Sequence, residues 1–135
     1  MRRLFFEASI LSDSEILRDG AAMLNEATIS NFRASLLGGL IEPGDPSYET
    51  SRKVFNGMID RHPRLIARCA DVADVMAAVN FGREQKLLVA IRGGGHNAGG
   101  LGVCDDGLVI DLSPMNYVRV DPKKKTCLLY TSRCV

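Results

Sequence analysis

The chain has 135 residues, of which 46% are hydrophobic and 24% charged, as expected for one soluble globular domain with a single core. Seventeen basic and sixteen acidic residues leave a net charge of +1, so the composition gives no indication of a nucleic-acid partner or an anionic membrane surface. No stretch reaches the roughly 20 apolar residues of a membrane span, and Glu7 and Asp13 interrupt any signal-peptide core near the start. We therefore expect a cytoplasmic protein without membrane contact.

The first half of the sequence predicts short helices and one brief strand. Residues 1–27 are predicted to be disordered or loosely helical. From Thr28 to Leu37 the apolar residues recur at three-to-four spacing, which predicts a helix that a pair of glycines ends. Leu40–Ile41 predicts an extended piece, and Tyr48–Val54 can form another helix before a loop that ends at Pro63.

The middle of the chain carries the clearest pattern. Leu65–Cys69 predicts a strand, Asp71 is a candidate N-cap for a helix that continues to Lys86, and Leu87–Ile91 predicts a second strand. The five consecutive apolar residues of that second strand suit burial on both faces. A βαβ unit of this kind predicts a parallel pair of strands joined by a right-handed crossover. Two further strands are predicted at Leu108–Leu112 and Tyr117–Asp121.

The cysteines and the second histidine predict no chemistry of their own. The four cysteines lack the close spacing of a disulfide framework or a metal-binding knuckle, so reduced thiols and no metal site are expected at Cys69, Cys104, Cys127 and Cys134. Cys69 and Cys104 are interpreted as small core or turn residues. His62 is interpreted as a surface-loop histidine.

The run IRGGGHNAGG, residues 91–100, places a histidine among five glycines directly after a predicted strand. The carboxyl ends of strands in open α/β sheets are where ligands usually bind. Glycine lets an anion approach backbone N–H groups without a Cβ in the way. The run therefore predicts a backbone site for a pyrophosphate, with His96 beside the bound cofactor.

Two other interpretations of this run fit less well. The spacing Gly93-x-Gly95-x-x-Ala98 matches a Rossmann fingerprint, with Asp111 at the end of the next strand, but GGLGVCDDG is too short and too rich in glycine to supply the helix. The oxyanion loop of esterases has its histidine before the glycines, and the chain has no G-x-S-x-G nucleophile motif. Asp111 itself is assigned no chemical role.

The residues around the run carry a resemblance to a known family. The motif RGGGHN, with LIARCADVADVMAAV before it and GLVIDLSPMNYVRVDPKKKT after it, resembles the FAD-binding domain of the p-cresol methylhydroxylase (PCMH) and vanillyl-alcohol oxidase superfamily. It is most similar to the berberine-bridge-enzyme-like branch. The resemblance extends from about Leu36 to Thr126, about two thirds of the chain. It implies an α+β fold, in which residues 28–126 form the N-terminal part of a truncated PCMH-type domain with a helical lead-in and a small βαβ sheet.

The resemblance also implies roles for individual residues. In this family the glycine-rich loop binds the FAD pyrophosphate, and its histidine commonly forms a covalent bond to the flavin 8α-methyl group; that histidine is His96 here. Arg92 would either offset pyrophosphate charge or brace the loop. Cys104 does not match the downstream cysteine that many members use for a second attachment. The implied FAD-binding residues are Arg92, Gly93, Gly94, Gly95, His96, Asn97 and Gly99.

The function implied is that of an FAD-dependent oxidoreductase, with a small-molecule substrate and oxygen as the electron acceptor. No catalytic base can be assigned, because family members carry their substrate-side residues in a second domain. The truncated chain alone is expected to be inactive. The alternatives are a non-catalytic dinucleotide-binding module and a fragment of a Rossmann-type NAD(P)-dependent dehydrogenase.

The last residues depart from this family pattern after Thr126. Cys127-Leu128-Leu129-Tyr130-Thr131-Ser132 matches the translation of a transposase mosaic-end adapter, and an inverted copy of the same DNA encodes the three residues that follow. We predict that residues 127–135 are a non-native read-through tail. The alternative is a genuine final strand, which the good strand formers in this segment favour.

Overall fold

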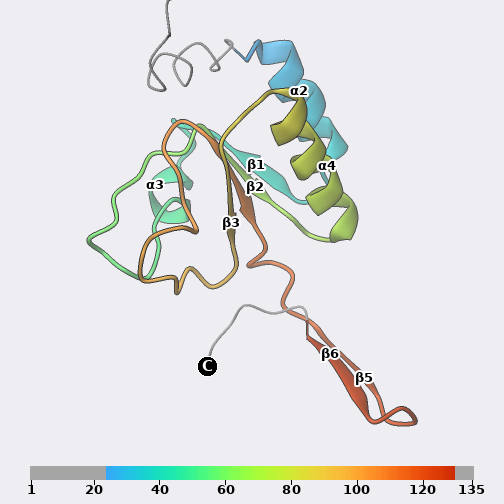
Figure 1. Cartoon of the computed structure of the whole chain (residues 1–135). Coiled ribbons are helices and arrows are strands. Elements are labelled where there is room, and N and C mark those ends of the chain that lie inside the picture. Colours follow the sequence, from blue (N-terminus) through green and yellow to red (C-terminus); the bar gives the residue numbers. More distant parts are fainter. Residues whose placement is uncertain (1–23, 130–135) are drawn as a thin grey trace, which may run out of the picture.

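The computed structural model describes residues 24–129, which form a four-stranded sheet, three helices and a separate two-stranded hairpin (Figure 1). The sheet strands are β1 (Gly39–Ile41), β2 (Leu65–Arg68), β3 (Val89–Arg92) and β4 (Leu108–Asp111). The helices are α2 (Glu26–Ser35), α3 (Tyr48–Ser51) and α4 (Val72–Glu84), and the hairpin consists of β5 (Val118–Asp121) and β6 (Thr126–Leu129). The mixed α/β architecture agrees with the predicted α+β class.

The sheet order, β1-β2-β4-β3, differs from the simple βαβ pair that the sequence predicts. β2 and β3 are parallel, as expected, but they do not pair with each other; each pairs with β4, which lies between them. The prediction of a directly paired β2 and β3 is therefore wrong. β4, which comes later in the chain, lies between the two strands of the predicted βαβ unit. The local periodicity of β2 and β3 cannot indicate that a later strand will separate them.

β3 is an edge strand, and this corrects the prediction that it is buried on both faces. Its side chains alternate, with Ala90 and Arg92 buried while Val89 and Ile91 are 37% and 60% exposed. The strand also begins two residues later than predicted, so Leu87 and Leu88 precede it. β4 takes the fully buried position instead, because it has a strand on each side and a packed layer on each face.

Two apolar layers cover the sheet. α2 and α4 lie on one face, where Phe32 stacks on Phe81 with ring centroids 4.0 Å apart. α3 and the long loops cover the other face, where Tyr48 packs with Ile66 and Val109. α3 is shorter than the predicted Tyr48–Val54 helix because the chain leaves it to reach the glycine run.

The helix boundaries follow from their capping residues. α2 begins at Glu26, two residues before the predicted start, because the Asn25 side chain accepts a hydrogen bond from the N–H of Thr28 at 2.7 Å. α4 begins after the predicted cap, Asp71, whose carboxylate accepts from the N–H of Asp74 at 3.0 Å. The remaining residues of the predicted N-terminal segment, 1–23, lie outside the described residues.

Gly38, just before β1, is fixed by close backbone packing. A Cβ at this position would lie 1.9 Å from the carbonyl oxygen of Arg68, whereas a Cβ at neighbouring Gly39 would meet nothing within 4 Å. We expect Gly38→Ala to lower the free energy of unfolding by about 2 kcal/mol or more, and Gly39→Ala to change it by less than about 0.5 kcal/mol. Urea unfolding of both variants tests this, and equal effects would contradict it.

The β5–β6 hairpin points away from the sheet (Figure 1) and pairs in antiparallel register from Val118 opposite Leu129 to Asp121 opposite Thr126. β6 includes Cys127, Leu128 and Leu129, the first residues of the predicted read-through tail. Their strand propensity accounts for the pairing whatever the origin of the segment, so that origin stays a prediction. No helix among residues 24–129 is long and apolar enough to cross a membrane.

Candidate functional site

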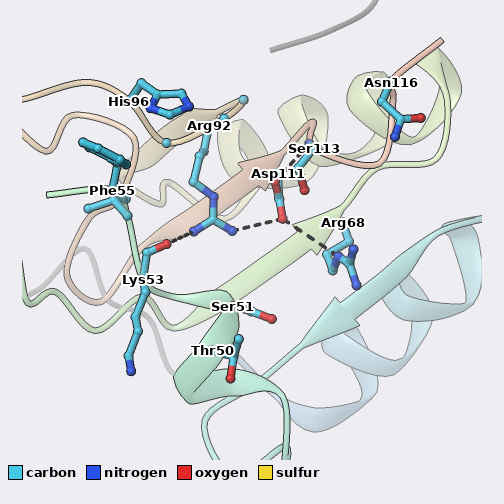
Figure 2. A pocket seen from close by; sticks show the side chains of 14 residues that line it. Thr50, Ser51, Lys53, Phe55, Arg68, Arg92, His96, Asp111, Ser113 and Asn116 are labelled. Carbon is cyan, nitrogen blue, oxygen red and sulfur yellow. Dashed lines mark hydrogen bonds and ion pairs between the residues drawn. The ribbon is translucent and has the colours of Figure 1, made fainter. Parts of the chain in front are cut away.

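A cavity of about 630 Å³ opens at the carboxyl ends of the parallel strands, where the glycine run begins (Figure 2). Its walls come from α3 and the segment after it, from the ends of β2, β3 and β4, and from the residues that follow β3 and β4. The lining residues are Thr50, Ser51, Lys53, Val54, Phe55, Arg68, Arg92, Gly93, Gly94, Gly95, His96, Asp111, Ser113 and Asn116.

Three charged residues form the floor of this cavity because they end neighbouring strands at the same level. Asp111 ends β4 and lies in register with Arg68 of β2 on one side and Arg92 of β3 on the other. The Asp111 carboxylate accepts a hydrogen bond from an Nη of Arg92 at 3.0 Å, and the Nε of Arg68 lies 3.9 Å from the same oxygen. Its other oxygen accepts from the N–H of Ser113 at 3.1 Å.

Arg92 braces the loop that follows it. Its side chain is buried, and besides Asp111 it donates to the carbonyl oxygen of Lys53 at 3.3 Å. Of the two predicted roles, offsetting ligand charge or bracing the loop, this geometry favours bracing. Asp111, assigned no role from sequence, is 3% exposed and provides the charge that makes burial of Arg92 tolerable.

The glycine loop, residues 93–96, lines the cavity and leaves several of its backbone donors uncommitted. Gly95 has φ of +74°, a conformation that favours glycine, and its carbonyl oxygen accepts from the N–H of Phe55 at 3.1 Å. Among residues 24–129, no acceptor takes a hydrogen bond from the N–H groups of Gly94, Gly95 or His96. Uncommitted N–H groups in a loop that is mostly glycine form a donor set that can bind a diphosphate.

His96 lies at the rim of the cavity against an aromatic neighbour. Its ring centroid is 5.1 Å from that of Phe55, with the two planes inclined by 47° (Figure 2). The side chain is exposed, and no hydrogen bond holds its imidazole to another described residue. The ring nitrogens are therefore free to react with or bind a group that enters the cavity.

Asn97 and Gly99 take part in the turn after the loop and do not line the main cavity. The Asn97 side-chain oxygen accepts from the N–H of Leu101 at 3.0 Å, and its carbonyl oxygen accepts from Gly100 at 3.1 Å. Their contribution is to close the turn. The chain between β3 and β4 contains no helix, so the Rossmann interpretation is wrong for this structure.

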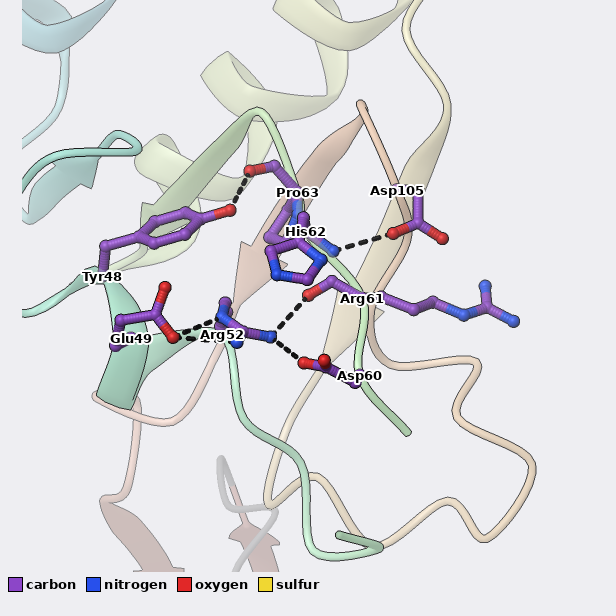
Figure 3. Close-up of polar contacts among 8 residues, drawn as sticks. All are labelled: Tyr48, Glu49, Arg52, Asp60, Arg61, His62, Pro63 and Asp105. Carbon is purple, nitrogen blue, oxygen red and sulfur yellow. Dashed lines mark hydrogen bonds and ion pairs between the residues drawn. The ribbon is translucent and has the colours of Figure 1, made fainter. Parts of the chain in front are cut away.

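The segment that carries Phe55 is held by polar contacts on the far side of α3 (Figure 3). Arg52 forms ion pairs with Glu49, at 2.8 Å, and with Asp60, and it donates to the carbonyl oxygen of Arg61 at 3.2 Å. Hydrogen bonding to Arg52 lowers the pKa of both carboxyls. The buried Tyr48 hydroxyl donates to the carbonyl oxygen of Pro63 at 2.8 Å, which closes the loop at its far end.

The remaining candidate groups have structural roles. Burial raises the pKa of Cys69 to about 12 and also raises the pKa of Cys104, so both thiols stay neutral, in agreement with their assignment to the core. His62 is exposed on a loop, as predicted. Among residues 24–129, no three His, Cys, Asp or Glu side chains gather into a metal-binding group.

The sequence predicted the glycine loop, but it did not indicate much of the rest of the cavity lining. Lys53, Phe55 and Arg68 were not predicted to lie at the site, nor were the polar residues Thr50, Ser51, Ser113 and Asn116. One signal was available, because Arg68, Arg92 and Asp111 each end a strand, and parallel strands bring such ends together.

Comparison with known proteins agrees with this geometry. A family model described as "FAD binding domain" matches residues 63–129, which extends into the first residues of the predicted tail. (R)-6-hydroxynicotine oxidase from Paenarthrobacter nicotinovorans is 34% identical over 87 residues, which cover 64% of this chain and 19% of that protein. The chain is similar to FAD-linked oxidases with a PCMH-type FAD-binding domain.

Solved structures of the family share the fold. The crystal structure of 6-hydroxy-D-nicotine oxidase from Arthrobacter nicotinovorans matches with a TM-score of 0.62 at 34% identity, over 64% of this chain and 19% of that one. Berberine-bridge-enzyme-like 1 from Physcomitrella patens matches with a TM-score of 0.66 at 26% identity, over 76% of this chain and 22% of that one. The chain thus spans about a fifth of the length of its relatives.

Proposed function

We propose that this chain supplies the diphosphate-binding part of an FAD-dependent oxidoreductase, with the FAD diphosphate held by the N–H groups of the glycine loop. The observation that carries the proposal is the set of uncommitted N–H groups at Gly94, Gly95 and His96, residues that line a cavity whose ionised side chains are mostly cationic. The match to an FAD-binding domain model and the similarity to FAD-linked oxidases support the same cofactor.

The hydrogen-bond donors of the cavity are of the kind that bind the phosphate groups of FAD. Backbone N–H groups can bind phosphate oxygens, and the buried pair of Arg92 and Asp111 keeps the loop in the conformation that presents them. FAD, when bound, accepts a hydride from a substrate C–H bond. In the whole protein we propose a small-molecule substrate and oxygen as the final electron acceptor.

We further propose that His96 attaches the flavin covalently. Its imidazole is exposed at the rim and is free of hydrogen bonds to the described residues, so a neutral ring nitrogen could bond to the flavin 8α carbon in place of one methyl hydrogen. The methyl C–H and the imidazole N–H would each lose a proton, the electron pair of the broken C–H bond would reduce the flavin ring, and oxygen would reoxidise it. The Phe55 ring lies against the imidazole, with the two centroids 5.1 Å apart. The bond would keep the cofactor in place and raise its reduction potential.

The test is expression of the complete gene with FAD, followed by acid precipitation and measurement of flavin absorbance in the pellet. We expect flavin in the pellet for the natural sequence and for His62→Ala, a matched change at an exposed loop histidine. His96→Ala should fold, bind FAD reversibly and leave the pellet colourless. Covalent flavin in His96→Ala would overturn the attachment, and failure of the natural protein to bind FAD would overturn the proposal as a whole.

A further inference from the structure

The cationic side chains of the cavity differ in how far they are already committed. Arg92 is buried and has both Asp111 and the Lys53 carbonyl oxygen as partners. Lys53 is exposed, and Figure 2 shows its side chain extending away from Asp111. Arg68 remains, with its side chain 49% exposed and only its Nε near a partner, 3.9 Å from Asp111.

Arg68 is thus the arginine of this cavity whose hydrogen-bond donors are uncommitted. Its two Nη groups donate no hydrogen bond to any residue from 24 to 129, and it extends from the end of β2, across β4 from the strand that leads into the glycine loop. Asp111 neutralises little of the positive charge of Arg68, because the Asp111 carboxylate already accepts hydrogen bonds from Arg92 and from the N–H of Ser113. The floor of the cavity therefore carries, at Arg68, a positive charge that is only partly neutralised.

We infer that Arg68 is a second contact for the diphosphate of the bound cofactor, made by a side chain from β2 and separate from the backbone donors of the glycine loop. This inference rests on the proposed function, since it assigns a residue to the same ligand. A guanidinium presents two parallel donors that match the oxygens of a phosphate, which an ammonium group cannot reproduce. Asp111 is hydrogen-bonded to Arg92 and only near Arg68, which leaves the Nη groups of Arg68 available for the ligand.

The experiment is a titration of the full chain with FAD, followed by flavin fluorescence, with His96→Ala in every sample so that binding stays reversible. Removing one charge-assisted contact in Arg68→Gln should weaken FAD binding by about 10- to 100-fold. It should also reduce the dependence of the dissociation constant on KCl concentration, because one fewer cation meets the diphosphate. Arg68→Lys should recover part of the affinity.

Lys53→Gln is the matched control, because it removes one positive charge from the same cavity without removing the proposed contact. We expect it to weaken FAD binding less than threefold. Thermal unfolding of each variant separates binding from stability, since a half-exposed pair at 3.9 Å adds little to folding. Unchanged FAD affinity in Arg68→Gln, an equal loss in Lys53→Gln, or failure of Arg68→Gln to fold would each overturn the role of Arg68. If the His96→Ala chain with Arg68 intact binds no FAD, the proposed function is wrong, and the role of Arg68 is wrong with it.

Discussion

Replacing Asp111 with asparagine should lower the free energy of unfolding by about 3–5 kcal/mol, because it removes the charge that balances the buried Arg92. Asparagine keeps the size of the side chain, so the effect reports charge and not a cavity. The arginine would then stay buried without a counter-ion, or it would move out and release the carbonyl oxygen of Lys53. Either outcome also disturbs the glycine loop, so FAD binding should weaken together with stability.

Asp106→Asn is a suitable control for this change. Asp106 is exposed in the loop before β4 and has φ of +52°, which asparagine tolerates well. We expect its free energy of unfolding to stay within about 0.5 kcal/mol of the original. Urea unfolding of both variants, followed by circular dichroism, makes the comparison. A loss below about 1 kcal/mol in Asp111→Asn would show that Arg92 does not depend on this carboxylate.

The second large effect is expected at Asp74, a buried carboxylate near the start of α4. It accepts hydrogen bonds from the N–H groups of Leu37 at 2.8 Å, Gly38 at 2.9 Å and Ala70 at 2.8 Å. It therefore ties the segment between α2 and β1 to the start of α4. Asp74→Asn should lower the free energy of unfolding by about 3 kcal/mol, since an amide NH₂ in place of one oxygen leaves buried donors without an acceptor.

The effect of Asp74 should depend on pH in a defined direction. Burial favours the neutral carboxyl, but the backbone hydrogen bonds from Ala70, Leu37 and Gly38 outweigh it and place the pKa of Asp74 below its ordinary value. Its contribution to stability is therefore complete above the unfolded pKa of about 3.9, and it is lost as the pH falls through the lower folded pKa.

Unfolding measured from pH 7 to pH 2 tests this expectation. The difference between the original chain and Asp74→Asn should be constant above about pH 5 and should shrink below about pH 4. Glu84→Gln, at an exposed position on the same helix, should change stability little at any pH. A difference that grows on acidification would mean that the neutral form of Asp74 is the one that stabilises the fold.

Much of this structure could be predicted because the signals were local. Asp71 was identified as the cap of α4 from its position before an apolar periodicity, and the structure confirms it. The glycine run was placed at the end of a strand by the same kind of reasoning, and the cavity is found there. Both conclusions depend on residues close together in the chain, where helix and strand periods apply directly.

The features that were missed depend on partners far apart in sequence. β4 lies between β2 and β3 because of how the whole sheet packs. The sequence of β3 alone does not show whether it is a central strand or an edge strand. Asp111 lies 19 residues beyond Arg92, so its role as counter-ion becomes visible only when their strands pair. Arg68 reaches the cavity for the same reason, through register with Asp111.

The central position of β4 determines when this domain can assemble during translation. β1, β2 and β3 leave the ribosome before it, yet β2 and β3 have no direct contact as strands and must wait for the residues that join them. Until Leu108–Asp111 emerges, both strands carry an edge of unpaired backbone N–H and C=O groups, the kind of surface that associates with other chains. Cotranslational folding of the sheet is thus one late step, and a pause in elongation after β3 has emerged but before β4 has emerged prolongs the aggregation-prone interval.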